Sequence, residues 1–293
     1  MNEYLLYRAA DVASRCMPRR FGYWVALRIA DCYYRFSHTA RRAVISNLRR
    51  IQEYRGLRPS GEKLDRMARS MFQHFGKYLV DFFRFSEMTD RQMERLVGIE
   101  HVDLLHAAAA ADRGIIILTA HLGNWELAGG VLAWLGHTPR AVVLPERLKR
   151  LNDLFQRRRR KRGIKPIPLG QAVRGLLRAL SRKECVALLG DRDFSPRQDL
   201  TPFFGAPARL PRGPAWLAMH AEAPLVPMFL LRQPDDTFLL RFHAPIFCSK
   251  RMEQDEARDR ILLILEEEIG RNPEQWYIFD DFWQTDQMPD RTT

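Results

Sequence analysis

An imidazole and a carboxylate lie five residues apart in the stretch GIIILTAHLGNWELAGG, residues 114–130. The imidazole is His121, and the carboxylate is Glu126. A carboxylate that holds one imidazole nitrogen leaves the other nitrogen as a general base. We therefore predict that His121 is a catalytic base and that Glu126 orients it.

The flanking residues predict where His121 lies in the fold. Residues 114–119 are apolar and β-branched, which predicts a buried strand, and residues 124–136 predict a helix. Gly123 and Asn124 suit the intervening tight turn and the helix N-cap. His121 then follows the carboxyl end of a strand, where open α/β sheets bind ligands, beside helix N–H groups that favour negative charge.

The rest of the chain predicts an α/β fold with an N-terminal helical layer. Residues 1–96 are typical of helices only, and from residue 97 strands and helices alternate, which indicates a mainly parallel sheet. Two apolar runs, 224–231 and 237–246, predict a hairpin that makes the sheet mixed. We expect two parts: an N-terminal helical, membrane-associating region (1–96) and an α/β domain (97–293).

Positive charge is concentrated in two zones. The net charge is +12; residues 1–60 hold twelve Arg and four acids, and residues 140–183 hold fifteen Lys and Arg and two acids. Such zones indicate an anionic partner: nucleic acid, a membrane surface or a phosphorylated ligand.

The N-terminal stretch FGYWVALRIADCYYRF (21–36) mixes aromatic and aliphatic residues with arginine. A helix of this kind can lie at a lipid interface or pack on the protein's own core. No apolar run reaches the roughly 18–20 residues that span a bilayer. The four cysteines lack metal-ligand spacing, so we expect no metal site and a reduced, cytoplasmic setting.

Four blocks resemble a known family. They are AHLGNWELAG (120–129), RLKRLNDLFQRRRRKRGI (147–164), the long block from GDRDF to PLVPMF (190–229), and NPEQWYIF (272–279). Their types and order resemble the lipid A biosynthesis acyltransferases of the lauroyl and myristoyl type, and the related mycobacterial phosphatidylinositol mannoside acyltransferases. The resemblance covers about residues 97–283.

The resemblance implies the lysophospholipid acyltransferase superfamily and its glycerolipid acyltransferase-like fold. It also implies transfer of a fatty acyl group from a thioester, on acyl carrier protein or coenzyme A, to a hydroxyl of a membrane glycolipid such as a lipid A precursor. The thioester is a substrate, so no cofactor is expected. The expected location is the cytoplasmic face of the inner membrane, without a spanning segment.

Further polar residues are expected to contact substrate. They are Asn124, Arg147, Asn152, Arg159, Asp191, Arg192 and Asp193. The basic run 157–162 could be a solvated helix face or could bind phosphate or an acidic carrier, with Arg159 matching the family's place before Gly163. Residues 191–193 follow a predicted strand and could form a loop ion pair, or Asp193 or Arg192 could orient the acceptor or His121.

Other functions remain open at this point. The acceptor could be a phosphatidylinositol mannoside or a lysophospholipid. A thioester hydrolase is a nearer rival, although no Gly-x-Ser-x-Gly or His-Glu-x-x-His motif is present. A nucleic-acid-binding protein would suit the basic zones, but no recognised module appears, and we expect no nucleic-acid partner.

Overall fold

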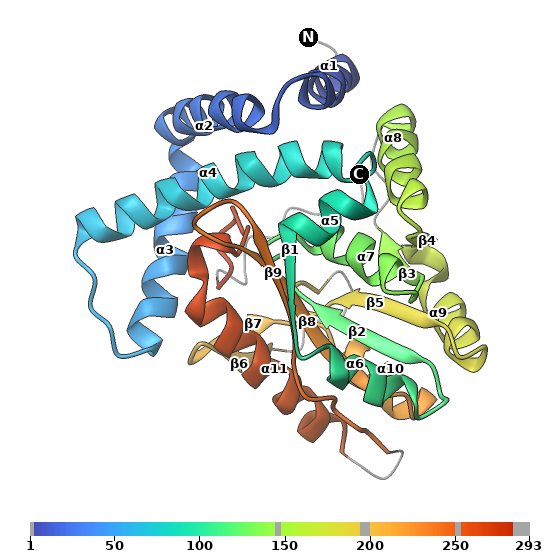
Figure 1. Cartoon of the computed structure of the whole chain (residues 1–293). Coiled ribbons are helices and arrows are strands. Elements are labelled where there is room, and N and C mark those ends of the chain that lie inside the picture. Colours follow the sequence, from blue (N-terminus) through green and yellow to red (C-terminus); the bar gives the residue numbers. More distant parts are fainter. Residues whose placement is uncertain (1–2, 144–147, 194–199, 250–252, 284–293) are drawn as a thin grey trace.

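The computed structural model describes residues 3–143, 148–193, 200–249 and 253–283. A seven-stranded sheet lies at the centre, with helices on both faces and the N-terminal helices across one end (Figure 1). The predicted α/β class with a mainly parallel sheet and an N-terminal helical layer is confirmed.

The elements have the following bounds. The helices are α1 (Glu3–Cys16), α2 (Arg19–Phe36), α3 (His38–Tyr54), α4 (Gly61–Phe85), α5 (Asp90–Leu96), α6 (Val102–Ala109), α7 (Trp125–Trp134), α8 (Lys149–Lys161), α9 (Ala172–Ser181), α10 (Gly213–Ala221) and α11 (Gln254–Arg271). The strands are β1 (Val97–Glu100), β2 (Ile115–Thr119), β3 (Pro139–Val143), β4 (Lys165–Pro168), β5 (Cys185–Leu189), β6 (Leu200–Phe203), β7 (Ala206–Arg209), β8 (Leu225–Arg232) and β9 (Phe238–Phe242).

The strand order places β2 near the middle of the large sheet. The order is β1-β9-β8-β2-β5-β3-β4, and β6 and β7 form a separate antiparallel pair. Within the large sheet only β8 and β9 pair antiparallel, as the predicted hairpin requires. All five residues of β2 are buried, which explains why this strand is a continuous apolar run.

Strands β3 and β5 separate at their carboxyl ends. Their pairing stops at Ala141 and Ala187, whereas β3 stays paired with β4 as far as Val143. Likewise β5 stays paired with β2 as far as Leu189. The described part of the sheet is therefore forked at the edge where the predicted site lies.

A buried ion cluster joins the N-terminal helices to the sheet. Asp81 of α4 and Arg232 of β8 form an ion pair, and both bond to the hydroxyl of Tyr23 on α2. Burial opposes the charge of Arg232, but the nearby Asp81 and Tyr23 raise the pKa of its guanidinium. Loss of either partner would leave a buried charge uncompensated in low-dielectric surroundings, and this would destabilise the fold. The cluster therefore ties α2 and α4 to β8.

The α4 residue His74 lies close to this cluster. Burial, together with the positive charges of Arg232 and Lys77, lowers the pKa of its imidazole to about 4. An unfolded chain binds a proton at His74 near pH 6.5, while the folded chain resists protonation until about pH 4. The free energy of unfolding therefore falls as pH decreases through this interval.

We expect this pH dependence to disappear in His74→Gln. The shift corresponds to at most about 3 kcal/mol of folding free energy lost between pH 6.5 and 4. Urea unfolding of the wild type and of His74→Gln across this range measures the difference. The control is His38→Gln, which changes an exposed histidine. Equal slopes for His74→Gln and wild type would contradict the prediction.

Candidate active site

His121 forms a paired contact with a buried carboxylate from the neighbouring strand. Asp191 Oδ1 lies 2.9 Å from His121 Nδ1, and Asp191 Oδ2 accepts the His121 backbone N–H at 2.9 Å. Each residue lies two positions beyond a strand end, and those ends, Thr119 and Leu189, are paired in register. The two side chains therefore meet because β2 and β5 are neighbours.

The Asp191 carboxylate is fully buried but ionised. Burial alone would raise its pKa, but the positive charge that His121 can carry, the His121 bonds and a bond from Trp276 Nε1–H (2.9 Å) lower it below its ordinary value. An ionised carboxylate only accepts hydrogen bonds, so Nδ1 carries the imidazole proton. Nε2 is then the acceptor, and the His121 side chain is 19 % exposed. The arrangement can abstract a proton.

Gly123 allows the His121 turn to approach β8. Its φ is +63°, and a Cβ there would lie 2.1 Å from the Leu230 carbonyl oxygen. The same oxygen accepts the Asn124 N–H at 2.8 Å. The segment after α11 lies on the other side, where Tyr277 N–H donates to the His121 carbonyl at 2.8 Å. His121 therefore sits in a turn whose backbone is bonded to two other segments.

The predicted contact between Glu126 and His121 is wrong. Glu126 instead accepts three hydrogen bonds from Arg159, at 2.5, 3.0 and 3.1 Å, and both side chains are largely buried. The reason is geometric: α7 begins at Trp125, so Glu126 leaves its first turn toward α8. Asp191 occupies the orienting position that was predicted for Glu126.

A largely apolar cavity of about 1050 Å³ opens at His121. This volume is at the upper end of the roughly 300–1,000 Å³ typical of ligand pockets. His121, Glu126 and Arg159 line it, together with residues of β3 and β5 that face both sides of the sheet. Ala141 and Ala187 pack in one core, Val142 and Leu188 in the other. The cavity thus extends through the fork between β3 and β5 and has an arm on each face.

The other predicted residues take several positions. Arg192 and Asp193 line the cavity, and Arg192 forms an ion pair with Asp280 at 2.5 Å. Asn124 is buried and caps α7 through Leu127 N–H (3.0 Å), as its predicted N-cap role requires. Asn152 accepts a bond from Gln156 on α8 and does not line the described cavity. Arg147 lies outside the described residues.

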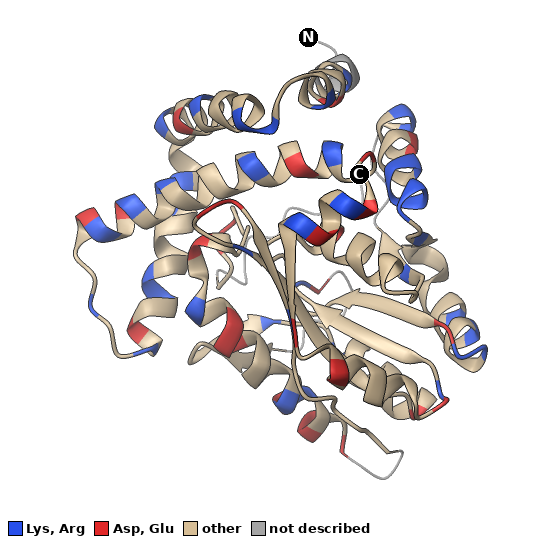
Figure 2. Cartoon of the chain, viewed as in Figure 1, with Lys and Arg blue, Asp and Glu red and all other residues tan. Residues whose placement is uncertain are grey.

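The basic run on α8 is largely engaged within the protein. Arg158 pairs with Asp11 and Glu87, and Lys161 also pairs with Glu87. Figure 2 shows the concentration of positive charge along this helix. Part of the run is thus neither solvated nor open to a ligand but paired with acids of the chain itself, and Arg159 alone of these residues lines the cavity.

The sequence analysis did not identify some residues of the site. Trp276 and Tyr277 belong to the aromatic NPEQWYIF block, but nothing in their local pattern indicates a bond to Asp191 or to the His121 backbone. Arg212 also lines the cavity, from the Leu-Pro-Arg-Gly-Pro turn that leads into α10. The resemblance pointed to both blocks without assigning these residues a role.

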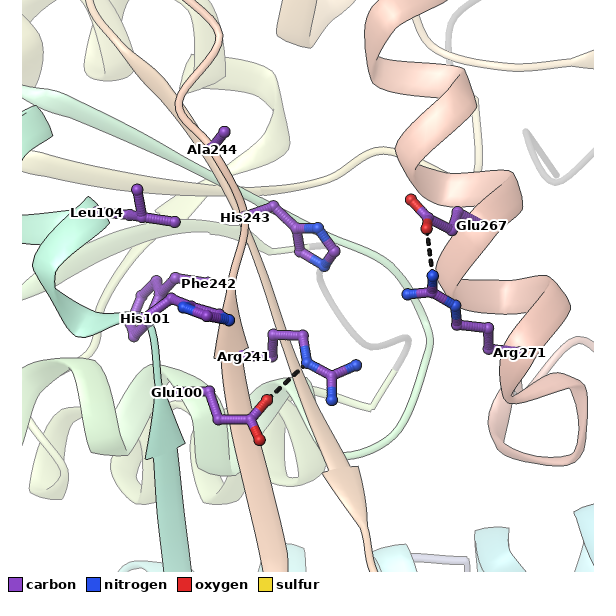
Figure 3. Close-up of a pocket in the computed structure, with 9 residues that line it drawn as sticks. All are labelled: Glu100, His101, Leu104, Arg241, Phe242, His243, Ala244, Glu267 and Arg271. Carbon is purple, nitrogen blue, oxygen red and sulfur yellow. Dashed lines mark hydrogen bonds and ion pairs between the residues drawn. The ribbon is translucent and has the colours of Figure 1, made fainter.

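A second hollow, of about 620 Å³, lies at the opposite edge of the sheet. It is formed at the carboxyl ends of β1 and β9, which run opposite to β2 (Figure 3). Its arginines are paired: Arg241 with Glu100 at 2.8 Å and Arg271 with Glu267 at 2.5 Å. Among the described residues, none that the sequence singled out lines this hollow.

Comparison with known proteins gives a family match over nearly the whole chain. The family model described as bacterial lipid A biosynthesis acyltransferase matches residues 2–285. The phosphatidylinositol mannoside acyltransferase of Mycobacterium tuberculosis (strain CDC 1551 / Oshkosh) is 31% identical over 233 residues, covering 75% of this chain and 70% of the relative.

Two relatives from Escherichia coli (strain K12) also match. The lipid A biosynthesis palmitoleoyltransferase is 25% identical over 219 residues, 74% of this chain and 71% of the relative. The lipid A biosynthesis lauroyltransferase is 27% identical over 193 residues, 64% of this chain and 61% of the relative.

We expect Gly123→Ala to disrupt the His121 turn, because the new methyl group would overlap the Leu230 carbonyl oxygen. Gly136→Ala is the matched control: its φ is +92°, but nothing lies within 4 Å of the new Cβ. The control should cost about 1–2 kcal/mol of unfolding free energy from the left-handed backbone alone. Gly123→Ala should cost about 4 kcal/mol or more. Equal losses in chemical denaturation would show that the close approach is absent.

Proposed function

The chain belongs to the bacterial lipid A biosynthesis acyltransferase family, and on this premise we propose that it transfers a fatty acyl chain from a thioester to a hydroxyl of a membrane glycolipid. It is an O-acyltransferase, as the family and its relatives are. The observation that carries the catalytic proposal is the Asp191–His121 hydrogen bond at the wall of the apolar cavity.

In the proposed reaction His121 Nε2 takes the proton of the acceptor hydroxyl. The hydroxyl oxygen attacks the thioester carbonyl carbon, forming the new ester C–O bond, and the C–S bond then breaks. The leaving sulfur takes a proton from the imidazolium, which restores neutral His121. Asp191 holds Nδ1–H throughout and stabilises the transient imidazolium.

We assign a different role to the Glu126–Arg159 pair. Three hydrogen bonds fix the Arg159 guanidinium in the cavity wall. A fixed guanidinium binds an anionic group, such as the phosphate of a pantetheine arm, better than a mobile surface arginine does. Glu126 is then a positioning residue. The carbon chain of the donor leaves the thioester on the side opposite to the phosphate and occupies the apolar cavity.

The chemistry supports a donor class, and the relatives support an acceptor class. Acyl carrier protein and coenzyme A both present a thioester on a phosphorylated arm, so either is a suitable donor. The relatives include transferases named for phosphatidylinositol mannoside and for lipid A. We therefore propose a membrane glycolipid as the acceptor class.

Isosteric variants separate the roles of the two carboxylates. His121→Ala and Asp191→Asn should lower kcat by about 10²–10⁴-fold, because the base is lost or its tautomer is no longer fixed. Glu126→Gln should mainly raise the KM for the donor, because Arg159 loses its anchor. Acyl transfer from a thioester to extracted glycolipid, with each substrate titrated, measures both parameters.

Two outcomes would contradict these assignments. Retention of more than a tenth of wild-type turnover in His121→Ala would exclude the base role, since general-base catalysis contributes at least about 10²-fold. A greater loss of kcat in Glu126→Gln than in Asp191→Asn would return the orienting role to Glu126. Acyl release measured with and without acceptor distinguishes transfer from hydrolysis.

We also propose that α2 binds the membrane surface. Its outer face carries large exposed apolar side chains at helical spacing: Phe21, Trp24, Ile29, Tyr33 and Phe36. We call this set the α2 stripe; exposed arginines, Arg20, Arg28 and Arg35, accompany it. The opposite face packs on α4, so the two alternatives for this helix apply to different faces. No described helix is long and apolar enough to cross a bilayer.

An anionic bilayer is the occupant that matches both the stripe and its charge. Apolar side chains insert at the boundary of the acyl chains, while arginines contact anionic headgroups. The glycolipid acceptor lies in the same membrane. We place the enzyme at the cytoplasmic face of the inner membrane, where thioester donors are expected.

Point substitutions test this surface without exposing the core that α2 shares with α4. The triple variant Trp24→Ala, Ile29→Ala, Tyr33→Ala should bind anionic liposomes far more weakly, by roughly tenfold for each side chain that inserts. Flotation at low and high salt measures it. Leu263→Ala is the control, because Leu263 of α11 is as exposed as Ile29, at 64%. Unchanged flotation of the folded triple variant would place the membrane contact elsewhere.

A further inference from the structure

Five aromatic rings line one arm of the cavity, one after another in space, starting beside His121. They are Trp125, Tyr78, Phe82, Phe155 and Tyr7. The His121 and Trp125 rings are 5.1 Å apart, and the following centroid distances are 4.5, 6.4, 5.1 and 5.8 Å. We call this set the ring path. It is continuous from the imidazole to α1.

The ring path crosses four helices and ends on the first of them. Trp125 belongs to α7, Tyr78 and Phe82 to α4, Phe155 to α8 and Tyr7 to α1. In Figure 1, α1 lies at the end of α4 and beside α8. Tyr7 also contacts Phe83, at 6.5 Å between centroids, so its ring is bounded by α4 and α8.

A buried ion pair fixes α1 in this position. Asp11 of α1 is fully buried, and its Oδ1 lies 2.6 Å from Arg158 Nη2 of α8. Arg158 also donates to Ser86 Oγ and Glu87 Oε1, both at 2.7 Å. Loss of Asp11 would remove the ion pair that joins α1 to α8. The position of Tyr7 is therefore fixed relative to α8.

The other arm of the cavity has more exposed walls. Leu169 and Val173 line it, and they are 38% and 56% exposed. An arm with solvent-exposed walls can let a longer chain project outward. An arm closed by packed rings cannot, because protein interiors yield little without loss of contacts.

We propose that Tyr7 closes the arm that holds the donor's carbon chain and thereby selects the length of the fatty acyl group transferred. This inference rests on the proposed acyl transfer at His121. A chain that is too long meets the Tyr7 ring before its carbonyl reaches Nε2, and a chain that is too short leaves the arm partly empty. One methylene in a hydrophobic pocket changes specificity by about 10–200-fold.

The test uses the full-length protein and an equimolar mixture of saturated acyl thioesters that differ by two carbons. Mass spectrometry of the acylated glycolipid gives the distribution of transferred chains. Tyr7→Ala should move the optimum to longer chains, and Tyr7→Trp should move it to shorter chains. Asp11→Asn should broaden the distribution, because α1 is then less firmly held. Discrimination between adjacent members should fall by about tenfold or more in Tyr7→Ala.

Control variants distinguish a change in chain-length selectivity from damage to the fold. Tyr7→Phe keeps the ring and should keep the optimum, and Val12→Ala changes an exposed residue of the same helix. A purely structural role would lower transfer of every chain equally. An unmoved optimum in active Tyr7→Ala and Tyr7→Trp would overturn the proposal. Absence of any acyl transfer by the wild type would instead refute the proposed function.

Discussion

The Asp191 carboxylate is the group on which the site depends. It is completely buried and bonds to the His121 backbone, the His121 ring and the Trp276 indole. These partners come from the end of β2 and from the segment after α11. An ionised group in such surroundings is stable only while its hydrogen bonds are kept. The same bonds that make burial of the charge tolerable also fix the imidazole, so stability and catalytic geometry depend on one set of contacts.

The sequence predicted the place of His121 but not its partner. An apolar run followed by a polar turn locates a strand end, because both signals are local. The partner requires knowledge of which strands are neighbours. Once β2 and β5 are known to pair Thr119 with Leu189, the shared offset of His121 and Asp191 predicts their contact. Glu126 was nearer in sequence, but the start of α7 directs it to Arg159.

The count of basic residues overstates the positive charge that is available to an outside partner. A basic zone in the sequence indicates an anionic partner. Some of the anionic groups that pair with the zone are, however, acids of the same chain. Arg158, Arg159 and Lys161 pair with acids of other segments. The prediction that residues 1–96 are helical is confirmed. The helical pattern could not show that Tyr7 of α1 lines the cavity, since Tyr7 reaches the ring path only through tertiary packing. The boundary at residue 96 stays a prediction.

The contacts of residues 275–277 have a consequence for protein synthesis. Trp276 bonds to Asp191, Tyr277 to the His121 carbonyl, and the Gln275 carbonyl accepts the Gly123 N–H. A ribosome translates β2, β5, His121 and Asp191 long before it reaches this segment. Until then the Asp191 carboxylate lacks one of its donors, and the His121 turn is open on one side. The site is therefore complete only after residue 277 has left the ribosome.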